Sequence, residues 1–166
     1  MAALSDLYVL FRVADAEYAL PASQVQQLES FSGVTTVPGT VPYVTGIAQV
    51  RGRIVPVIDL RLLFGLPQVE ATLDSRIIVV ELGLRSVGLR VDLSREVLKL
   101  DAEQFQPTPT IVAEQSRGFV LGVARVGTRL LMLFDLAKVL GEEQQLHDDP
   151  VHTLEGGQLG RRALPG

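Results

Sequence analysis

The chain has 166 residues, of which 47% are hydrophobic, and its formal net charge is −4 at pH 7. This length suits one compact domain or two small subdomains that share an interface, and the apolar fraction excludes wholesale disorder. The scattered basic residues give no electrostatic footprint for nucleic acid, and the absence of cysteine excludes disulfides, thiolate metal sites and a cysteine nucleophile.

The first residues lack the charged start and apolar block of a secretory signal, and no apolar run has the length of a membrane span. We therefore expect a cytoplasmic protein without direct membrane insertion.

The N-terminal part of the sequence predicts short strands. Two apolar stretches, Phe11-Arg12-Val13 and Tyr18-Ala19-Leu20, flank a polar turn and read as paired strands. The segment 34–43 contains two prolines and a glycine and is expected to be an irregular crossover.

The segment from Gly46 to Gly65 predicts a hairpin followed by one helical turn. Arg51-Gly52 separates two apolar runs, as a two-residue hairpin loop does. Asp59 and Gly65 stand where the N-cap and the C′ residue of a single turn would lie. Pro56 removes one ladder donor, so its strand is expected to be a sheet edge or to carry a bulge, and an exposed edge would offer a docking surface.

This segment is repeated further along the chain. The residues from Gly122 to Gly141 align with it without a gap, 76 positions later, and Gly127-Thr128 takes the place of the hairpin loop. Asp135 and Gly141 repeat the predicted cap positions. The two earlier apolar stretches have a fainter echo in Val80-Glu81-Leu82 and Val87-Gly88-Leu89, at an offset of 69.

The repeat predicts the domain organisation. We expect an all-β domain over residues 6–141, with one subdomain at about 6–66, another at about 76–141, and the polar stretch 67–75 between them. Short strands with one helical turn per unit favour two small barrels in tandem, since closure removes exposed edges. Residues 142–166 are expected to form a frayed helix to about Leu146 and then a flexible tail.

No residues are predicted to be catalytic, to bind a cofactor or to bind a metal. Both histidines, His147 and His152, fall in the predicted tail, where nothing holds a general base or a ligand in place. Asp59 and Asp135 are interpreted as helix caps, and a hydrolase would require both carboxylates in one open cleft. Phosphate-binding glycine loops and nucleophile elbows are absent from the sequence.

Two classes of binding protein remain. A small-barrel nucleic-acid binder would need a basic groove with stacking aromatics, whereas several of the aromatic residues here, such as Phe11 and Phe134, sit at core positions of predicted strands. Protein–protein binding is favoured, because an edge strand and an apolar cleft between two barrels would both accept a protein partner.

The motif string resembles the CheW-like domain over roughly residues 6–141. The resemblance is carried by Tyr18-Ala19-Leu20-Pro21, Thr36-Val37-Pro38, Pro42-Tyr43-Val44, Gly46-Ile47, Val50-Arg51-Gly52 with Ile54-Val55-Pro56-Val57-Ile58-Asp59-Leu60-Arg61, Val87-Gly88-Leu89 with Val91-Asp92, and Gly122-Val123 with Leu131 to Leu136. The family resemblance implies two five-stranded SH3-like barrels and a non-catalytic adaptor without cofactors. Its implied partners are the regulatory domain of a CheA-type histidine kinase and the cytoplasmic tip of chemoreceptors, in arrays at the inner membrane face.

The resemblance also implies a set of partner-binding residues. Val25, Gln27 and Arg51 match positions of partner contact, and Gly46, Val87 and Val97 match positions near the groove between the barrels or on the strands that support it. The apolar members of this set have a plain core interpretation as well, because apolar surface and apolar core look alike in sequence.

This chain departs from the family pattern in three places. Gln27 replaces the usual Glu, Gln49 replaces the usual Asn, and Leu93 stands where Gly is common. These changes leave open whether the chain serves a flagellar pathway or a pilus or gliding-motility pathway.

Overall fold

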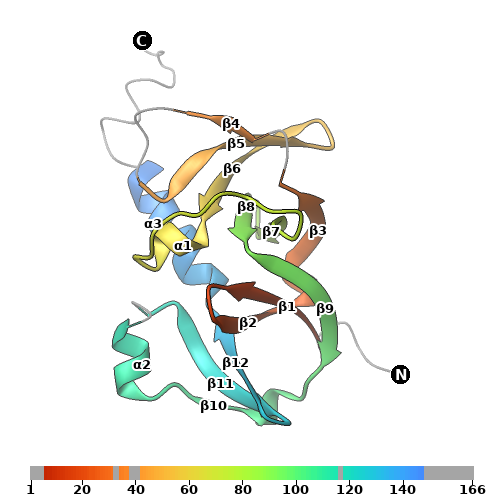
Figure 1. The fold of residues 1–166 in the computed structure, drawn as a ribbon, viewed down its shortest axis with the longest axis vertical. Helices are drawn as coiled ribbons and strands as arrows, with labels where there is room; N and C mark the ends of the chain where they lie inside the picture. The colour runs from red at the N-terminus through yellow and green to blue at the C-terminus, as the bar shows by residue number, and fades with distance from the viewer. Residues whose placement is uncertain (1–5, 32–33, 38–41, 116–117, 148–166) are drawn as a thin grey trace. The chain divides into compact units, whose positions relative to one another are not determined.

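The computed structural model of the chain describes residues 6–31, 34–37, 42–115 and 118–147. Within these residues the chain forms twelve strands and a few short helices (Figure 1). It divides into two compact units, one ending at Asp135 and one beginning at Leu136 with helix α3 (Leu136–His147). All of these strands lie in the first unit, and the predicted all-β class is confirmed.

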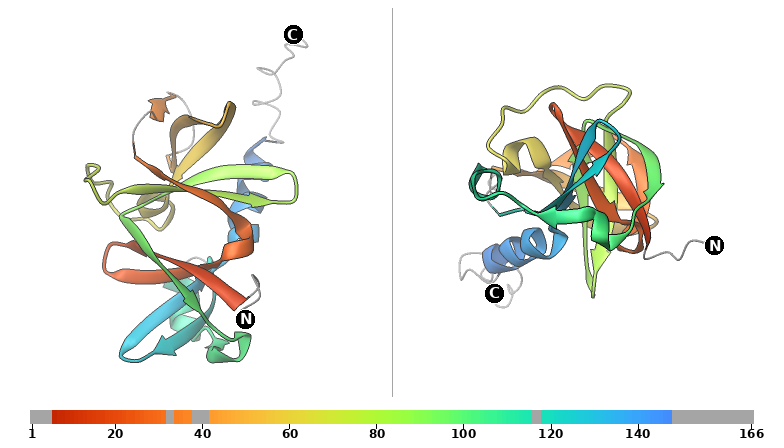
Figure 2. Two further views of the ribbon diagram at one scale, coloured as in Figure 1. Left: turned by 90° about the vertical axis from the view of Figure 1, so that its right-hand side faces the viewer. Right: turned by 90° about the horizontal axis from the view of Figure 1, so that it is seen from below.

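The strands of the first unit form two strongly twisted sheets (Figure 2). The terminal sheet contains, in spatial order, β10 (Phe105–Pro107), β11 (Val120–Val126), β12 (Arg129–Phe134), β2 (Ala16–Pro21), β1 (Leu7–Val13) and β9 (Leu93–Lys99). The central sheet contains β4 (Val34–Thr36), β5 (Val44–Val50), β6 (Arg53–Asp59), β8 (Arg85–Val91), β7 (Arg76–Leu82) and β3 (Val25–Ser30). Each sheet therefore has five strands of six or seven residues and one three-residue strand at an edge.

The two sheets share one topology. In both, an antiparallel hairpin (β5–β6 or β11–β12) pairs in parallel with a second hairpin (β7–β8 or β1–β2). The strand register shifts between Val44 and Gly46 in one sheet and between Val120 and Gly122 in the other, 76 positions further along. The internal repeat of the sequence is therefore a repeat of structure that includes its irregularities.

The predicted subdomains, residues 6–66 and 76–141, do not coincide with the sheets. β1 and β2 pair with β9 to β12, so residues 7–21 and 93–134 form the terminal sheet and residues 25–91 form the central one. The polar stretch 67–75 joins α1 to β7 inside the central segment. The hairpin β1–β2 resembles β7–β8 in sequence, and β5–β6 resembles β11–β12. This resemblance is compatible with β1–β2 joining either β5–β6 or β11–β12, so the repeat alone could not show to which sheet β1–β2 belongs.

The single turn of helix α1 (Leu60–Leu63) has the capping that its flanking residues indicate. The carboxylate of Asp59 accepts a hydrogen bond from the backbone N–H of Arg61, at 2.9 Å. Gly65 has a φ of +83°, and the N–H groups of Gly65 and Leu66 donate to the carbonyls of Leu62 and Arg61. This pair of bonds is the Schellman motif, which requires the left-handed conformation that glycine adopts without strain.

Helix α3 differs from the prediction at its C-terminal end. It begins directly after Asp135, but it continues through Gly141 to His147. Gly141 lies inside this helix, so its predicted role as the C′ residue is wrong, and the helix runs through the segment expected to form a frayed extension to about Leu146. The Glu, Gln and Leu residues that follow Gly141 are good helix formers and outweigh the cost of one glycine, about 1 kcal/mol. The predicted tail after residue 147, including His152, lies outside the described residues.

Two other expectations about strands change in the structure. Residues Val34–Thr36 of the predicted crossover form the short edge strand β4. The strand with Pro56 is interior, since β6 pairs with both β5 and β8. Its registered pairing with β8 starts at Val57, so Pro56, which has no backbone N–H, precedes that ladder and interrupts none of its registered pairs.

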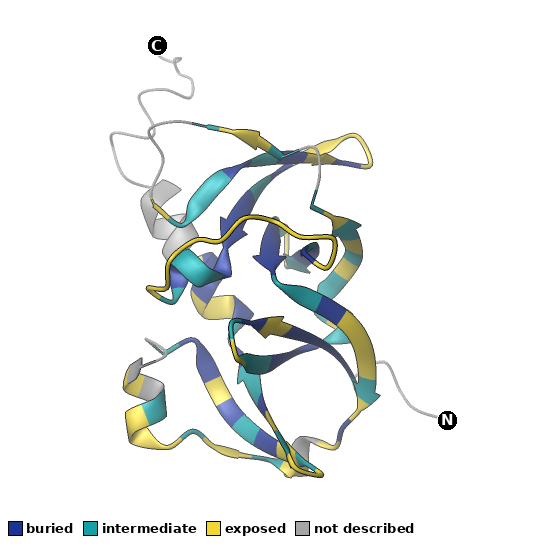
Figure 3. Ribbon diagram, viewed as in Figure 1, coloured by how far each residue is buried: buried dark blue, intermediate teal, exposed yellow. Residues whose placement is uncertain are grey.

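Each sheet has a hydrophobic core of its own. The central sheet buries a cluster that includes Val55, Val57 and Ile77, and the terminal sheet buries one that includes Leu10 and Leu131. Figure 3 shows the buried residues along the middle of the strands and the exposed residues at the tips of the hairpins. Rigid strands thus carry exposed tips, which is the arrangement that presents side chains to other molecules.

Candidate partner-binding surfaces

Large apolar side chains are exposed where two hairpins of the central sheet end. Ile54 of β6 is 68% exposed and Leu84, in the turn between β7 and β8, is 98% exposed. Arg53 Nη2 donates to Ser86 Oγ at 2.9 Å and ties the two hairpins together. Arg51, Arg53, Ile54 and Leu84 are called the hairpin surface below. Apolar groups flanked by arginine are typical of protein-binding surfaces.

The hairpin loop beside this surface has a strained backbone. Arg51 and Gly52 have φ angles of +52° and +78°, the pattern of a type I′ turn. Asparagine and glycine favour these positions, whereas arginine in the left-handed region costs about 1–2 kcal/mol. The side chain of Arg51 is exposed, so the structure retains an unfavourable residue where it can reach a partner.

The terminal sheet carries a counterpart of the hairpin surface. Leu130 of β12, which is 62% exposed, occupies the position equivalent to Ile54. It lines an open groove of about 940 Å³ whose other apolar walls include Val112, Val123 and Met132. The repeat has therefore preserved an exposed apolar residue next to each hairpin loop.

Ionised groups border this groove. Arg129 donates to the carboxylate of Glu17 at 2.8 Å and to that of Glu96 at 2.9 Å. The hydrogen bond from Arg129 to Glu17 holds the pKa of Glu17 below its usual value, although burial alone would raise it. The pKa of Arg129 is raised by the same contacts.

The outer strand of each sheet adds exposed apolar residues. β3 pairs only with β7, and β9 pairs only with β1, so the described strands leave one edge of each unpaired. Leu28 on β3 and Val97 on β9 are exposed. Such edges are able to extend a sheet with a partner strand or to contact a helix.

The predicted site residues fall into different settings. Arg51 and Val97 are exposed, and Gln27 is half-buried on β3. Val25 is also half-buried and lies opposite Val80, which in turn pairs with Val87. Val25, Val80 and Val87 thus form a row across three neighbouring strands. Val87 is only 1% exposed, so its side chain belongs to the core and does not reach the surface.

Close packing of the sheet explains why position 46 is a glycine. A Cβ atom at this position would lie 2.8 Å from the carbonyl carbon of Thr35 and closer still to its oxygen. The site is buried in β5, where β4 approaches closely. Gly46 is thus required by packing of the sheet, whatever its part in binding.

Sequence reasoning missed Ile54, Leu84 and Leu130. Ile54 and Leu130 had a detectable signal, because an apolar residue recurs two positions after each hairpin loop at the repeat offset. Leu84 had none, since a leucine in a turn is not distinguishable by type from a leucine that folds back onto the core.

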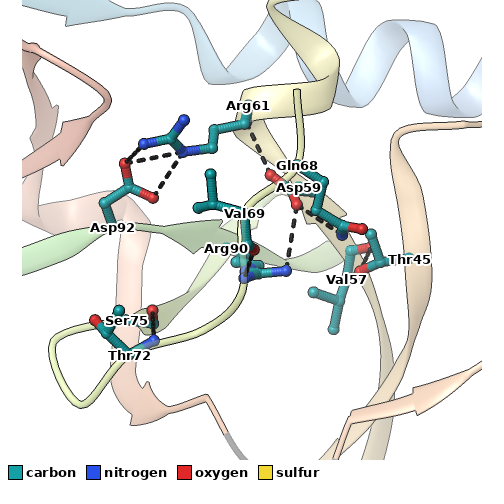
Figure 4. Close-up of polar contacts among 10 residues, drawn as sticks. All are labelled: Thr45, Val57, Asp59, Arg61, Gln68, Val69, Thr72, Ser75, Arg90 and Asp92. Atoms are coloured by element: carbon teal, nitrogen blue, oxygen red, sulfur yellow. Dashed lines mark hydrogen bonds and ion pairs between the residues drawn. The ribbon is translucent and has the colours of Figure 1, made fainter. Parts of the chain in front are cut away.

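The buried carboxylate of Asp59 is fully engaged in structural contacts. It is 2% exposed and accepts hydrogen bonds from the backbone N–H of Arg61 and from Gln68 Nε2, the latter at 3.0 Å. Arg90 Nη1 lies 3.4 Å from the same carboxylate (Figure 4). A carboxylate held by three donors and shielded from solvent is positioned to stabilise the fold, not to exchange protons with a substrate.

Two lowered carboxylate pKa values predict how stability depends on pH. Burial would raise the pKa of Asp92, but hydrogen bonds from Arg61 and the Ala14 amide, with the charges of Arg61 and Arg90, lower it overall. A carboxylate whose pKa is lowered by folding stabilises the native state above its unfolded pKa of about 4 and loses that contribution below it. Urea unfolding midpoints should therefore fall as the pH drops below about 4.

The pH effect has an internal control. In Asp92→Asn the stability should be lower than wild type at neutral pH, and the gap should narrow in acid, where Asp92 is protonated in both states. A gap that stays constant from neutral to acid pH would mean that ionisation of Asp92 contributes nothing.

No described helix is long and apolar enough to cross a membrane. Likewise, no cluster of three or more metal-ligating side chains occurs among the residues that the structure describes.

Comparisons with known proteins agree on one family. The model of the CheW-like domain matches residues 7–144. The chain is 33% identical to Chemotaxis protein CheW of Klebsiella aerogenes over 144 residues, 87% of each chain. It is 33% identical to Chemotaxis protein CheW of Bacillus subtilis, over 81% of this chain and 86% of that one. A crystal structure of the scaffolding protein TtCheW from Thermoanaerobacter tengcongensis aligns with a TM-score of 0.71 and 32% identity, covering 80% of this chain and 90% of that one.

Proposed function

Because the chain belongs to the CheW-like domain family, we propose that it is an adaptor that couples chemoreceptors to a CheA-type histidine kinase. In this role it catalyses no reaction, acts in the cytoplasm and is recruited to receptor arrays at the inner face of the membrane. Its work is to hold two other proteins in a fixed arrangement.

One observation carries this proposal. Exposed apolar residues lie in two separate places, Ile54 at the hairpin surface and Leu28 and Val97 on the outer strands β3 and β9. An adaptor that joins two proteins needs two separate contact surfaces of this kind. The engaged carboxylate of Asp59 supports the absence of a catalytic role.

In this proposal each partner binds a different surface. The hairpin surface around Arg51 binds the regulatory domain of the kinase, where its arginines and apolar side chains supply the contact. The edge strands β3 and β9, with Val25, Gln27 and Val97, bind the helical tip of the receptor. Val87 supports the β3 surface from the core, through the row that it forms with Val80 and Val25.

Calorimetric titration with the cognate kinase regulatory domain tests the proposal. Folded wild-type chain should bind in the micromolar range, and Arg51→Glu should weaken binding about tenfold, or 1.4 kcal/mol, with little change in melting temperature. Arg125→Glu is the matched control, since Arg125 is also exposed but lies on the terminal sheet. No binding by folded wild-type chain at tens of micromolar would reject the kinase assignment, and a gel shift at low salt would then test the nucleic-acid alternative.

The strained backbone at Arg51 predicts that one substitution raises stability while it weakens binding. Arg51→Asn replaces a strained residue with one that favours a type I′ turn, so the free energy of unfolding should rise by about 0.5–1 kcal/mol. Binding to the kinase domain should weaken in the same variant, because the guanidinium is lost. Urea unfolding and titration of one protein sample measure both effects, and a variant that gains stability with undiminished binding would remove Arg51 from the interface.

A further inference from the structure

The chain passes between its two sheets at two short crossings within the described residues. The first leads from β2 to β3 through the 3-10 turn η2 (Ala22–Gln24). The second leads from β8 to β9 through a single residue, Asp92. A one-residue crossing between two separately cored sheets is a position at which a small change of backbone angles would rotate one sheet against the other.

Polar contacts converge on this residue from both sheets. Ala14 lies in the β1–β2 turn of the terminal sheet, and its backbone N–H donates a hydrogen bond to Asp92 Oδ2 at 2.7 Å. From the central sheet's helix α1, Arg61 donates through Nη2 at 2.8 Å and through Nε at 3.1 Å (Figure 4). The N–H of Asp92 donates to the carbonyl of Arg12, at 2.9 Å. Arg61, Asp92 and Ala14 are called the clamp below.

An apolar contact also joins the sheets, and it has a different character. Phe64, at the end of α1, stacks on Tyr18 with ring centroids 5.3 Å apart. It also meets Phe134 and Phe119 at centroid distances of 6.1 and 6.2 Å. Ring contacts of this kind are less directional than a bidentate ion pair, so they hold the sheets together but constrain their angle less narrowly than the polar contacts do.

We propose that the clamp sets the relative orientation of the two sheets and that Arg61 is its positioning residue. A planar guanidinium bound by two nitrogens to one carboxylate fixes direction as well as distance. The Ala14 turn adds a third point, with Ala14 itself held at a φ of +55°. When the clamp is broken, the sheets keep their own cores and the aromatic contact, but their mutual angle varies over a wider range.

The chain offers a control with the same chemistry. Arg129 is bound to Glu17 and Glu96, yet all three residues lie in the terminal sheet, on β12, β2 and β9. Removing Arg129 therefore deletes an arginine with two carboxylate contacts without touching a contact between sheets. Any effect common to Arg61 and Arg129 variants is an effect of lost ion pairing in general.

Spin-label distance measurement tests the inference, because the chain contains no cysteine that would interfere. Labels at Leu84→Cys and Lys99→Cys report the angle between sheets, and labels at Leu130→Cys and Lys99→Cys report the terminal sheet alone. Each pair is measured in wild type, Arg61→Met, Arg61→Lys and Arg129→Met. The isolated chain is used, so the result is independent of the partners proposed above.

The expected result is specific to the Arg61 variants and to the inter-sheet label pair. Arg61→Met should widen the inter-sheet distance distribution and leave the distribution within the terminal sheet unchanged, whereas Arg129→Met should leave the inter-sheet width as in wild type. Arg61→Lys, which keeps the charge but loses the fork, should give an intermediate width. A wild-type inter-sheet width in both Arg61 variants would overturn the proposal. So would loss of folded structure in both, since the sheets would then depend on the clamp to fold.

Discussion

Replacing Asp59 with alanine is expected to lower the free energy of unfolding by about 3–5 kcal/mol. The substitution leaves the buried guanidinium of Arg90 without its carboxylate, and it removes the N-cap of α1. Among the described residues, Arg90 would retain the carbonyl of Val69, at 2.6 Å, the ring of Phe31, at 4.3 Å, and the charge of Asp92. Substitutions that leave a buried charge without its partner cause some of the largest losses of stability known for single residues. Urea unfolding followed by circular dichroism measures it.

Two further variants separate the causes. Asp59→Asn keeps a side-chain oxygen that caps a helix well, but it loses the negative charge facing Arg90 and turns an amide towards Gln68. If the ion pair dominates, Asp59→Asn should be nearly as unstable as Asp59→Ala; if capping dominates, it should be close to wild type. Asp74→Ala, which deletes an exposed pair with Arg95, should cost less than about 1 kcal/mol. A loss of that small size in Asp59→Ala would contradict the expected result.

The role of Asp59 illustrates what local sequence can predict. A cap, a two-residue loop and a glycine at the end of a turn involve residues a few positions apart, so their spacing in the chain is their spacing in space. The helical turn after Asp59 and the hairpin at Arg51 were therefore accessible from the sequence. The partners Gln68 and Arg90 were not, because the loop and strand that carry them reach Asp59 only when the sheet has formed.

Long-range pairing was the part that the sequence could not supply. The repeat of hairpins at one offset predicted duplication, and the structure has two sheets of one topology. Which hairpins combine is decided by parallel pairing of β6 with β8 and of β12 with β2, and that pairing has no local signature. Similarly, Val87 and Val97 look alike in sequence, although one lies in a row of core residues and the other on an outer strand.

Replacing Gly46 with alanine should destabilise the chain by about 2–3 kcal/mol through overpacking. The new Cβ would collide with the carbonyl group of Thr35 on β4, and backbone atoms in a sheet cannot turn aside as a flexible side chain does. We expect β4 to separate from β5, since a three-residue edge strand has few other contacts to hold it. Urea unfolding measures the loss, and faster hydrogen exchange of backbone amides in β4 would locate it.

Gly122 is the matched control for Gly46, because it occupies the equivalent bulge of the terminal sheet. There the added Cβ would lie 2.8 Å from the carbonyl oxygen of Gln106, a milder clash, so Gly122→Ala should cost about 1 kcal/mol. Equal losses in the two variants would contradict a steric origin. The comparison also bears on binding, since Gly46 is a predicted partner-binding residue. If kinase binding per folded molecule is normal in Gly46→Ala, the glycine acts only by letting β4 pack; if it is reduced, β4 itself supports the hairpin surface.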